Sequence, residues 1–226
     1  MAKAPRVGDA KTRLVPPLTP EDAAALSACF IQDAAENIAA AGMLAPIEGY
    51  IAFAPRGAEA EFRALVAPDT RLLPTRRPGL SASLLDATTD LLAAGYGSVC
   101  LVNSDSPTLP TSILVEAARA LSSPGDRLVL GPSEDGGYYL IGLKHAHARL
   151  FEDIAWSTPQ VFVQTEERAR ELGLSVFRLP VWYDVDDIGS LHRLRSELRQ
   201  VSGGGTPIFA ARRTSAFLRS LFRDDP

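Results

Sequence analysis

Basic residues gather at the start of the chain. The segment MAKAPRVGDAKTRL carries Lys3, Arg6, Lys11 and Arg13 around Gly8. A proline and a glycine within it allow the backbone to bend tightly around an anion, and phosphate is the obvious candidate. The segment lacks the glycine spacing of a P-loop, so it predicts a phosphate-binding loop of another kind. The alternative is a solvated basic N-terminus.

Acidic residues follow three predicted strands. The set comprises Asp105 after residues 98–103, Glu134 and Asp135 after residues 127–130, and Asp184 and Asp186 in the segment WYDVDD. In open α/β sheets, ligands bind beyond the carboxyl ends of the strands, so we expect these carboxylates to lie near a ligand. For any one of them, the alternative is a turn or a helix cap.

The acidic set indicates a metal ion of a particular kind. Its ligands are oxygens without histidine, which suits Mg²⁺ or Mn²⁺ completed by water and substrate phosphates. Zinc is not expected there, since His145, His147 and His192 lie apart from these acids and fit surface or capping roles. Together with the basic loop, the carboxylates predict a site for a metal-bound diphosphate.

Helical and extended patterns alternate along the chain. Helices are predicted at residues 20–41, 59–66, 80–94, 111–121, 158–172 and 188–199, and strands at residues 47–54, 71–73, 98–103, 127–130, 138–143 and 175–179. Such alternation predicts a sheet with helices on both faces. Around Gly136-Gly137 two strands follow each other too closely for a helical crossover, so we expect one of them to run antiparallel.

The chain is expected to form one main domain, residues 1–201, followed by a glycine linker and an amphipathic C-terminal helix, residues 202–226. The tail places Phe217, Leu218, Leu221 and Phe222 on one face. We expect this face to pack on its own domain or to form a homodimer with a partner subunit. Binding to a membrane surface is the alternative.

Composition excludes several classes of protein. Of the 226 residues, 46% are hydrophobic, which is enough for a full core. The net charge of −4 argues against a nonspecific nucleic-acid binder. The basic N-terminus has no apolar run behind it, and the sequence contains no stretch of 18 uncharged apolar residues. We therefore expect neither secretion nor a transmembrane segment, and a cytoplasmic location.

Five motifs carry a resemblance to a known family. They are KAPRVGDAKTRL at residues 3–14, NSDSPTLP at 103–110, GPSEDGGYYLIGL at 131–143, WSTP at 156–159 and WYDVD at 182–186. In these motifs the chain resembles the DUF2064 family of GT-A-like transferases over residues 2 to 200. That family has been linked to arsenosugar-type glycosyl transfer. It is similar, more distantly, to phospholactate guanylyltransferases and molybdenum-cofactor nucleotidyltransferases.

The resemblance implies a GT-A-like three-layer α/β/α sandwich with a mainly parallel mixed sheet around a nucleotide-binding crevice. The implied phosphate-binding residues are Lys3, Arg6, Gly8, Lys11 and Arg13, and the implied metal ligands are Asp105 with Asp184 or Asp186. Glu134 and Asp135 would face the acceptor, one of them as general base, and the substrate would also contact Gly136, Gly137, Ser157 and Thr158. The two hydroxyl residues could equally act as caps at the start of a helix.

The chain departs from the family pattern at three places. The hydrophobic strand that usually precedes the KAP motif is absent from the printed sequence, so we expect the first central strand to be missing or truncated. Residues 76–86 read RRPGLSASLLD in place of a Gly-Asp-Leu-Gly stretch. Asn103 and Ser106 stand where the family tends to have a small residue and a cysteine.

Three functions are compatible with this pattern. The first is a metal-dependent transferase that moves a glycosyl group from a nucleotide-diphospho-sugar to a small acceptor. The second is a nucleotidyltransferase that joins a nucleoside triphosphate to a phosphorylated small molecule and releases pyrophosphate. The third is a catalytically inactive nucleotide-binding module.

Overall fold

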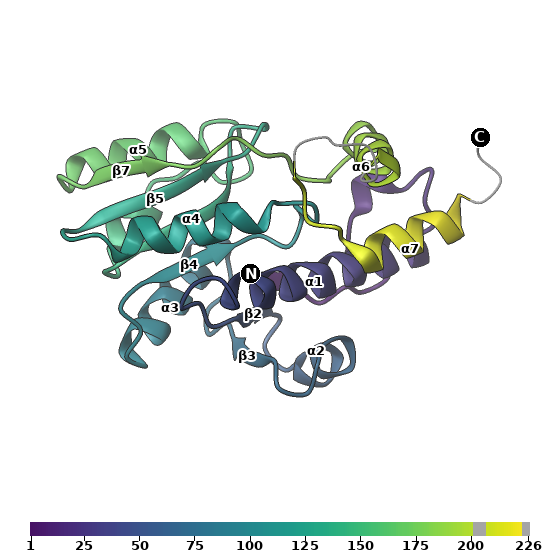
Figure 1. Ribbon diagram of the computed structural model, residues 1–226, viewed down its shortest axis with the longest axis horizontal. Helices are drawn as coiled ribbons and strands as arrows, with labels where there is room; N and C mark the ends of the chain where they lie inside the picture. The colour runs from purple at the N-terminus through teal and green to yellow at the C-terminus, as the bar shows by residue number, and fades with distance from the viewer. Residues whose placement is uncertain (201–206, 223–226) are drawn as a thin grey trace.

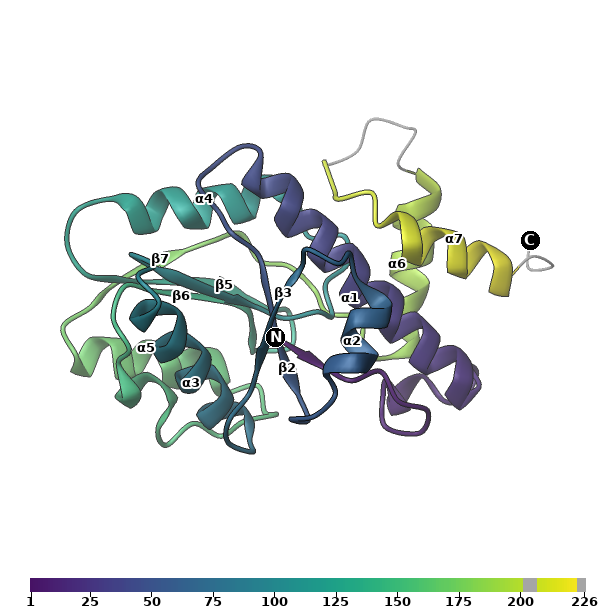
Figure 2. The same ribbon diagram turned by 90° about the horizontal axis from the view of Figure 1, so that it is seen from below.

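The protein has a mixed α/β fold in which helices cover both faces of the strands. The computed structural model describes residues 1–200 and 207–222. In Figure 2 the strands β5 to β7 are seen edge-on, with α1 and α4 on one side and α3 and α5 on the other. This arrangement confirms the three-layer α/β/α class expected from the sequence.

The strands form two sheets (Figure 1). The first sheet is parallel, with the order β1-β2-β3, and contains β1 (Ala2–Lys3), β2 (Tyr50–Ala54) and β3 (Arg71–Pro74). The second has the order β4-β6-β5-β7 and contains β4 (Val99–Val102), β5 (Arg127–Pro132), β6 (Tyr138–Leu143) and β7 (Ser175–Arg178). Strand β6 runs antiparallel to β4 and β5, whereas β5 and β7 are parallel. The expected antiparallel strand next to Gly136-Gly137 is confirmed.

Strand β1 is present at the edge of the first sheet and has two residues, and the expected truncation of the first strand stays a prediction. No strand pairing joins the two sheets among the described residues. The Met1 amine donates a hydrogen bond to the Val102 carbonyl at 2.7 Å, at the end of β4. A cavity of about 150 Å³ lies between β2 and β4 and is lined by side chains that include Ala52, Val99 and Leu140.

The helices on the two faces enclose separate apolar cores. One core lies under α1 (Pro20–Gly42) and α4 (Thr111–Ser122), and the other lies under α3 (Leu80–Ala93), α5 (Val161–Glu171) and the short 3-10 helix η2 (Ala148–Phe151). Strand β5 serves both cores, because Val129 belongs to the first whereas Leu128 and Leu130 belong to the second. Helix α2 (Glu59–Leu65) packs beside β3.

The C-terminal helices form a third core with α1. Helix α6 (Ile188–Gln200) and helix α7 (Arg212–Leu221) place Leu191, Leu194 and Leu218 against Leu26 and Phe30. The apolar face of α7 therefore packs on its own chain, one of the two outcomes expected. The predicted homodimer through this helix stays a prediction, and the expected glycine linker lies outside the described residues. None of the helices in the described ranges combines the length and apolar character that crossing a membrane requires.

A buried carboxylate on α1 anchors the start of α7. Asp33 is fully buried, and its two oxygens accept hydrogen bonds from the backbone N–H groups of Arg213 at 3.0 Å and Thr214 at 2.8 Å. These N–H groups belong to the first turn of α7, where a helix has no partners of its own. A side chain distant in sequence thus acts as the cap.

Replacing Asp33 with alanine is expected to lower the free energy of unfolding by about 2 kcal/mol, because two N–H groups at the start of α7, one of them buried, lose their acceptor. Urea denaturation measures this change. Glu36→Ala is the matched control, since Glu36 lies on the same helix and only makes an exposed ion pair with Arg213. We expect the control to cost at most about 1 kcal/mol. Equal losses in the two variants would contradict the capping role.

Candidate active site

A large cleft opens at the carboxyl ends of β4 and β5. Its volume is about 1040 Å³, and its walls come from the N-terminal loop, the segments after β4 and β5, and the segments around residues 157 and 185. The sequence-predicted site residues that line it are Lys3, Lys11, Arg13, Asp105, Asp135, Gly137, Ser157, Thr158, Asp184 and Asp186. A cleft of this size can enclose a ligand as large as a nucleotide.

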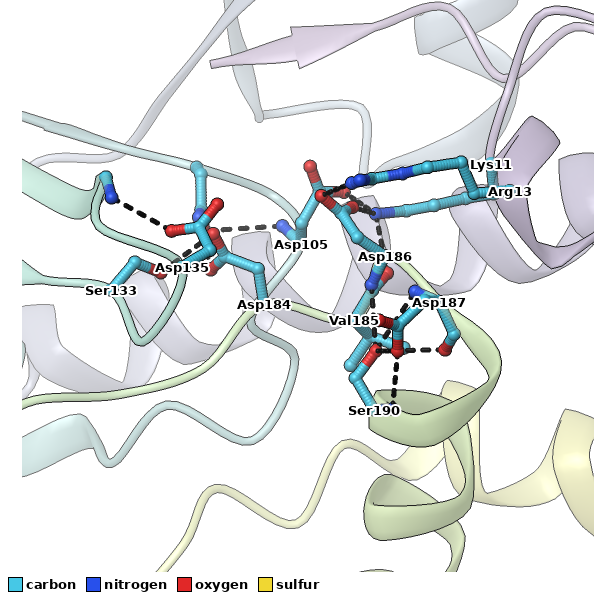
Figure 3. Close-up of polar contacts among 12 residues, drawn as sticks. Lys11, Arg13, Asp105, Ser133, Asp135, Asp184, Val185, Asp186, Asp187 and Ser190 are labelled. Carbon is cyan, nitrogen blue, oxygen red and sulfur yellow. Dashed lines mark hydrogen bonds and ion pairs between the residues drawn. The ribbon is translucent and has the colours of Figure 1, made fainter. Parts of the chain in front are cut away.

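Lys11 joins two of the carboxylates at one end of the cleft (Figure 3). Its Nζ atom lies 2.5 Å from Asp105 Oδ1 and 2.9 Å from Asp186 Oδ1, and it also donates to the Val185 carbonyl at 2.9 Å. The lysine side chain is 7% exposed, whereas the two carboxylates are about a third exposed. One buried ammonium group thus meets two carboxylates that each lie more than 90 positions away from it in the sequence.

The charge of Lys11 is held by its partners. Burial by itself would lower the pKa of Lys11, but the carboxylates of Asp105 and Asp186 raise it above its ordinary value. Burial likewise opposes ionisation of Asp186, yet Lys11 and Arg13 hold the pKa of Asp186 below its usual range. At neutral pH the Lys11 ammonium is therefore charged and pairs with the ionised carboxylate of Asp186, with Asp105 as its second partner.

Arg13 approaches the same carboxylate from the solvent side. Its Nη2 atom lies 2.5 Å from Asp186 Oδ2, and its side chain is 70% exposed. The backbone of Asp186 is fixed by the start of α6, where Ser190 Oγ accepts its N–H at 3.1 Å and Asp187 Oδ1 accepts the N–H of Ser190 at 2.8 Å. Because most of the Arg13 side chain is exposed, it can turn from Asp186 to a ligand while Asp186 stays in place.

Asp184 lies deeper and already has three donors. Asn103 Nδ2 and Ser106 Oγ donate to Oδ1 at 2.8 and 2.6 Å, and Ser133 Oγ donates to Oδ2 at 2.8 Å. Burial raises the pKa of Asp184 above its ordinary value, and these hydrogen bonds act against that shift. The carboxylate ties the segment after β4 to the segment after β5. Asp186, whose side chain is about a third exposed, is better suited to bind a ligand than Asp184, whose oxygens already accept from three donors.

The segment after β5 turns tightly at the glycines predicted from the sequence. Asp135 is exposed, and its Oδ1 atom accepts the N–H of Gly137 at 2.9 Å. Gly136 has a φ of +87°, and a Cβ atom there would lie 2.4 Å from the Pro159 carbonyl oxygen. Its own carbonyl accepts the N–H of Phe162 at 2.9 Å. Gly136 therefore holds the wall formed by residues 156–159 against the Asp135 turn.

Replacing Gly136 with alanine is expected to lower the free energy of unfolding by about 3 kcal/mol, from a disfavoured φ and a backbone clash. Gly57→Ala is the matched control, because Gly57 has a similar φ of +94° and nothing within 4 Å of an added Cβ. We expect about 1 kcal/mol for the control. Chemical denaturation of both variants measures the difference, and equal losses would show that the close approach to Pro159 is unimportant.

Four predicted site residues do not line the cleft. They are Arg6, Gly8, Glu134 and Gly136. Arg6 instead pairs with Glu61 of α2 at 2.6 Å, and Glu134 pairs with Arg193 of α6 at 2.8 Å. Both pairs are exposed, so these charges are directed to the surface rather than to the cleft. These positions do not support phosphate binding by Arg6 or catalysis by Glu134.

Other cleft residues were not assigned a role from the sequence. The set comprises Thr75, Gly79, Leu80, Ser83 and Tyr138, together with Trp156 from the WSTP motif. Leu80 is 50% exposed, and the rings of Tyr138 and Trp156 meet edge to face at 6.3 Å. The sequence signal that could have pointed to this side of the cleft is Leu80, within the segment RRPGLSASLLD that departs from the family pattern. The cleft thus has an apolar and aromatic side in addition to its charged end.

Comparisons with known proteins agree with the resemblance noted from the sequence. The sequence model of the DUF2064 family, described as "uncharacterized protein conserved in bacteria", matches residues 37–158, more than half of the chain. A comparison with curated proteins finds no match. Among solved structures, a "putative nucleotide-diphospho-sugar transferase" from Desulfovibrio desulfuricans G20 superposes with a TM-score of 0.83 and 29% identity, over 97% of this chain and 91% of that one.

A second solved structure is more distant. It is CMP:2-keto-3-deoxy-manno-octonic acid synthetase complexed with CTP, with a TM-score of 0.53 and 12% identity, over 76% of this chain and 88% of that one. At this identity the likeness concerns the fold alone.

Proposed function

Because the chain belongs to the DUF2064 family, we propose that its cleft holds a nucleotide-diphospho-sugar and a divalent metal ion, and that the protein transfers the glycosyl group to a small acceptor. The similarity to the Desulfovibrio protein over nearly the whole chain supports a sugar nucleotide as donor. The charged end of the cleft holds the diphosphate, and the apolar side holds the remainder of the substrates.

One observation carries the proposal. Lys11 and Arg13 from the N-terminal loop meet Asp105 and Asp186 from two distant segments, within ion-pair distance, inside the cleft of about 1040 Å³. Opposite charges at one cleft end cancel each other in the absence of a ligand. A metal-bound diphosphate uses both, because the metal takes the carboxylates and the phosphate oxygens take the cations.

The donor set fits Mg²⁺ or Mn²⁺. Asp105 and Asp186 already direct one oxygen each toward a single positive group, the ammonium of Lys11, and hard divalent ions prefer such oxygens. In the bound state these two residues would hold the metal, and Lys11 would turn to the phosphate oxygens. Bound there, the metal supplies stabilisation of the negative charge that develops on the leaving diphosphate.

The chain's own groups provide the remaining functions. Lys11, Arg13 and Lys3 stabilise the leaving diphosphate, and their contacts strengthen as its charge grows. Asp135 is exposed in the cleft and accepts the acceptor's proton as general base. Asp184 keeps the segments after β4 and β5 in register through its three hydrogen bonds. Leu80, Tyr138 and Trp156 exclude water from the apolar side.

Nucleotidyl transfer from a nucleoside triphosphate is the second candidate, and the three cations that line the cleft favour it, since a triphosphate carries more negative charge. Products separate the two reactions. Purified protein with Mg²⁺ is first screened for thermal stabilisation by sugar nucleotides and nucleoside triphosphates, because a ligand of the folded state raises the melting temperature. Stabilising ligands are then assayed for release of nucleoside diphosphate and of pyrophosphate.

Release of nucleoside diphosphate from a sugar nucleotide, dependent on Mg²⁺ or Mn²⁺, is the expected result. Pyrophosphate release from a triphosphate would overturn glycosyl transfer in favour of nucleotidyl transfer. Metal-dependent stabilisation without either product, across a panel of small acceptors, would identify a catalytically inactive nucleotide-binding module instead.

A further inference from the structure

Two histidines and an aspartate meet far from the cleft. Asp126 directly precedes β5, and His145 and His147 follow β6. Strands β5 and β6 are antiparallel, with Val129 opposite Gly142, so the start of one strand lies beside the end of the other. Strand β5 has six residues, a length of about 20 Å, and the cleft lies at its opposite end.

The three side chains converge on one another. His147 Nε2 lies 2.8 Å from Asp126 Oδ2, and His145 Nδ1 lies 3.2 Å from the same oxygen. One potential ligand atom from each residue lies within 4.8 Å of the other two. His145 is 68% exposed, whereas His147 and Asp126 are about a quarter exposed, so the group is open to solvent on one side.

The backbone that presents these groups is anchored. Lys144 Nζ donates to the Gly125 carbonyl at 2.7 Å, which ties the segment after β6 to the turn before β5. The carbonyl of His147 accepts the N–H of Leu150 at 3.2 Å, and Leu150 is fully buried under α3 and α5. The positions of the three ligands therefore depend on the core and not on an isolated loop.

We infer that Asp126, His145 and His147 form a binding site for a divalent transition metal ion such as Zn²⁺. Two imidazoles and one carboxylate are a preferred ligand set of such ions, which complete their coordination with water on the open side. The second oxygen of the carboxylate, Asp126 Oδ1, is buried and accepts no hydrogen bond from the part of the chain that the structure describes. The oxygen that meets both imidazoles is Oδ2, and it is the oxygen that a bound ion would use.

This site is independent of the proposed function. Its nitrogen ligands select ions different from the Mg²⁺ or Mn²⁺ that the oxygens of Asp105 and Asp186 suit. A metal here would join the turn before β5 to the segment after β6, and so stabilise the sheet end opposite the cleft. Because it binds the folded chain, the ion is expected to raise the melting temperature.

Calorimetric titration of the metal-free protein with Zn²⁺, in the presence of excess Mg²⁺ to saturate oxygen sites, tests the inference. We expect one Zn²⁺ ion per chain at this site. His145→Ala and His147→Ala are each expected to weaken binding by at least about tenfold. His192→Ala, which alters the third histidine of the chain, and Asp105→Asn, in the cleft, are the matched controls and are expected to leave this binding event unchanged.

His145 is mostly exposed, so its replacement leaves the fold intact, and melting temperatures of all variants in chelator check this point. Zn²⁺ binding that is unchanged in a His145→Ala, His147→Ala double variant would overturn the inference. So would the absence of saturable Zn²⁺ binding to the unsubstituted protein. Failure of the proposed transferase reaction would show instead as missing products, with Zn²⁺ binding intact.

Discussion

Asp105→Asn is expected to lower metal-dependent turnover by at least about 100-fold. The substitution keeps the size of the side chain but removes the charge that faces Lys11 at 2.5 Å and, in the proposed complex, the metal. Losing a preorganised electrostatic contact to the developing charge costs about two to three orders of magnitude in other enzymes. The measurement is the rate of nucleoside diphosphate release at saturating Mg²⁺.

Asp9→Asn is the matched control for this variant. Asp9 lines the same cleft and lies on the N-terminal loop, but we assign it no contact with metal or diphosphate. Its turnover is expected to stay within about threefold of the unsubstituted protein, as general electrostatic screening predicts. Full metal-dependent activity in Asp105→Asn would show that Asp105 is not a ligand of the catalytic metal ion.

Lys11→Met is expected to change three quantities in different directions. Without metal, Asp105 and Asp186 lose the ammonium group that compensates them. The free energy of unfolding should then fall by about 2 kcal/mol. This loss is smaller than that expected for a fully buried ion pair, because both carboxylates are partly exposed. Mg²⁺ should bind the variant more tightly, since no lysine competes for the carboxylates. Turnover should fall by about 100-fold or more, since a cation that stabilises the diphosphate is lost.

Urea denaturation in chelator and in Mg²⁺ measures the first two quantities, and product release measures the third. Arg13→Gln is the control, because Arg13 is 70% exposed and its ion pair is expected to contribute less than about 1 kcal/mol to stability. If the Lys11→Met variant bound Mg²⁺ more weakly than the unsubstituted protein, the proposal that lysine and metal compete for the same two carboxylates would be contradicted.

The meeting of Lys11 and Arg13 with Asp105 and Asp186 could be expected from the sequence. The rule that ligands lie beyond the carboxyl ends of strands needs only the order of elements, and the order was clear because residues 99–102 and 128–130 form continuous apolar runs. The antiparallel direction of β6 could also be predicted from the sequence, since the connection at Gly136-Gly137 is too short to contain a helix. These features depend on short-range patterns.

The ion-pair partners of Arg6 and Glu134 could not be predicted from the sequence in the same way. Their partners, Glu61 and Arg193, lie 55 and 59 residues away on helices whose rotation about their axes is set by the core. The sequence pattern around a charged loop residue does not distinguish a residue that faces a cleft from one that faces a neighbouring helix. The Asp126, His145 and His147 group was hidden for a related reason, because it exists only through the register of β5 and β6.

The most direct test is anomalous diffraction from crystals of the protein grown with Mn²⁺ and a nucleoside diphosphate that stabilises it. We expect a manganese peak in contact with carboxylate oxygens of Asp105 and Asp186, and phosphate oxygens in contact with both the ion and Lys11. A diphosphate bound elsewhere, or bound in the cleft with Lys11 still paired to both carboxylates and no manganese between them, would contradict it.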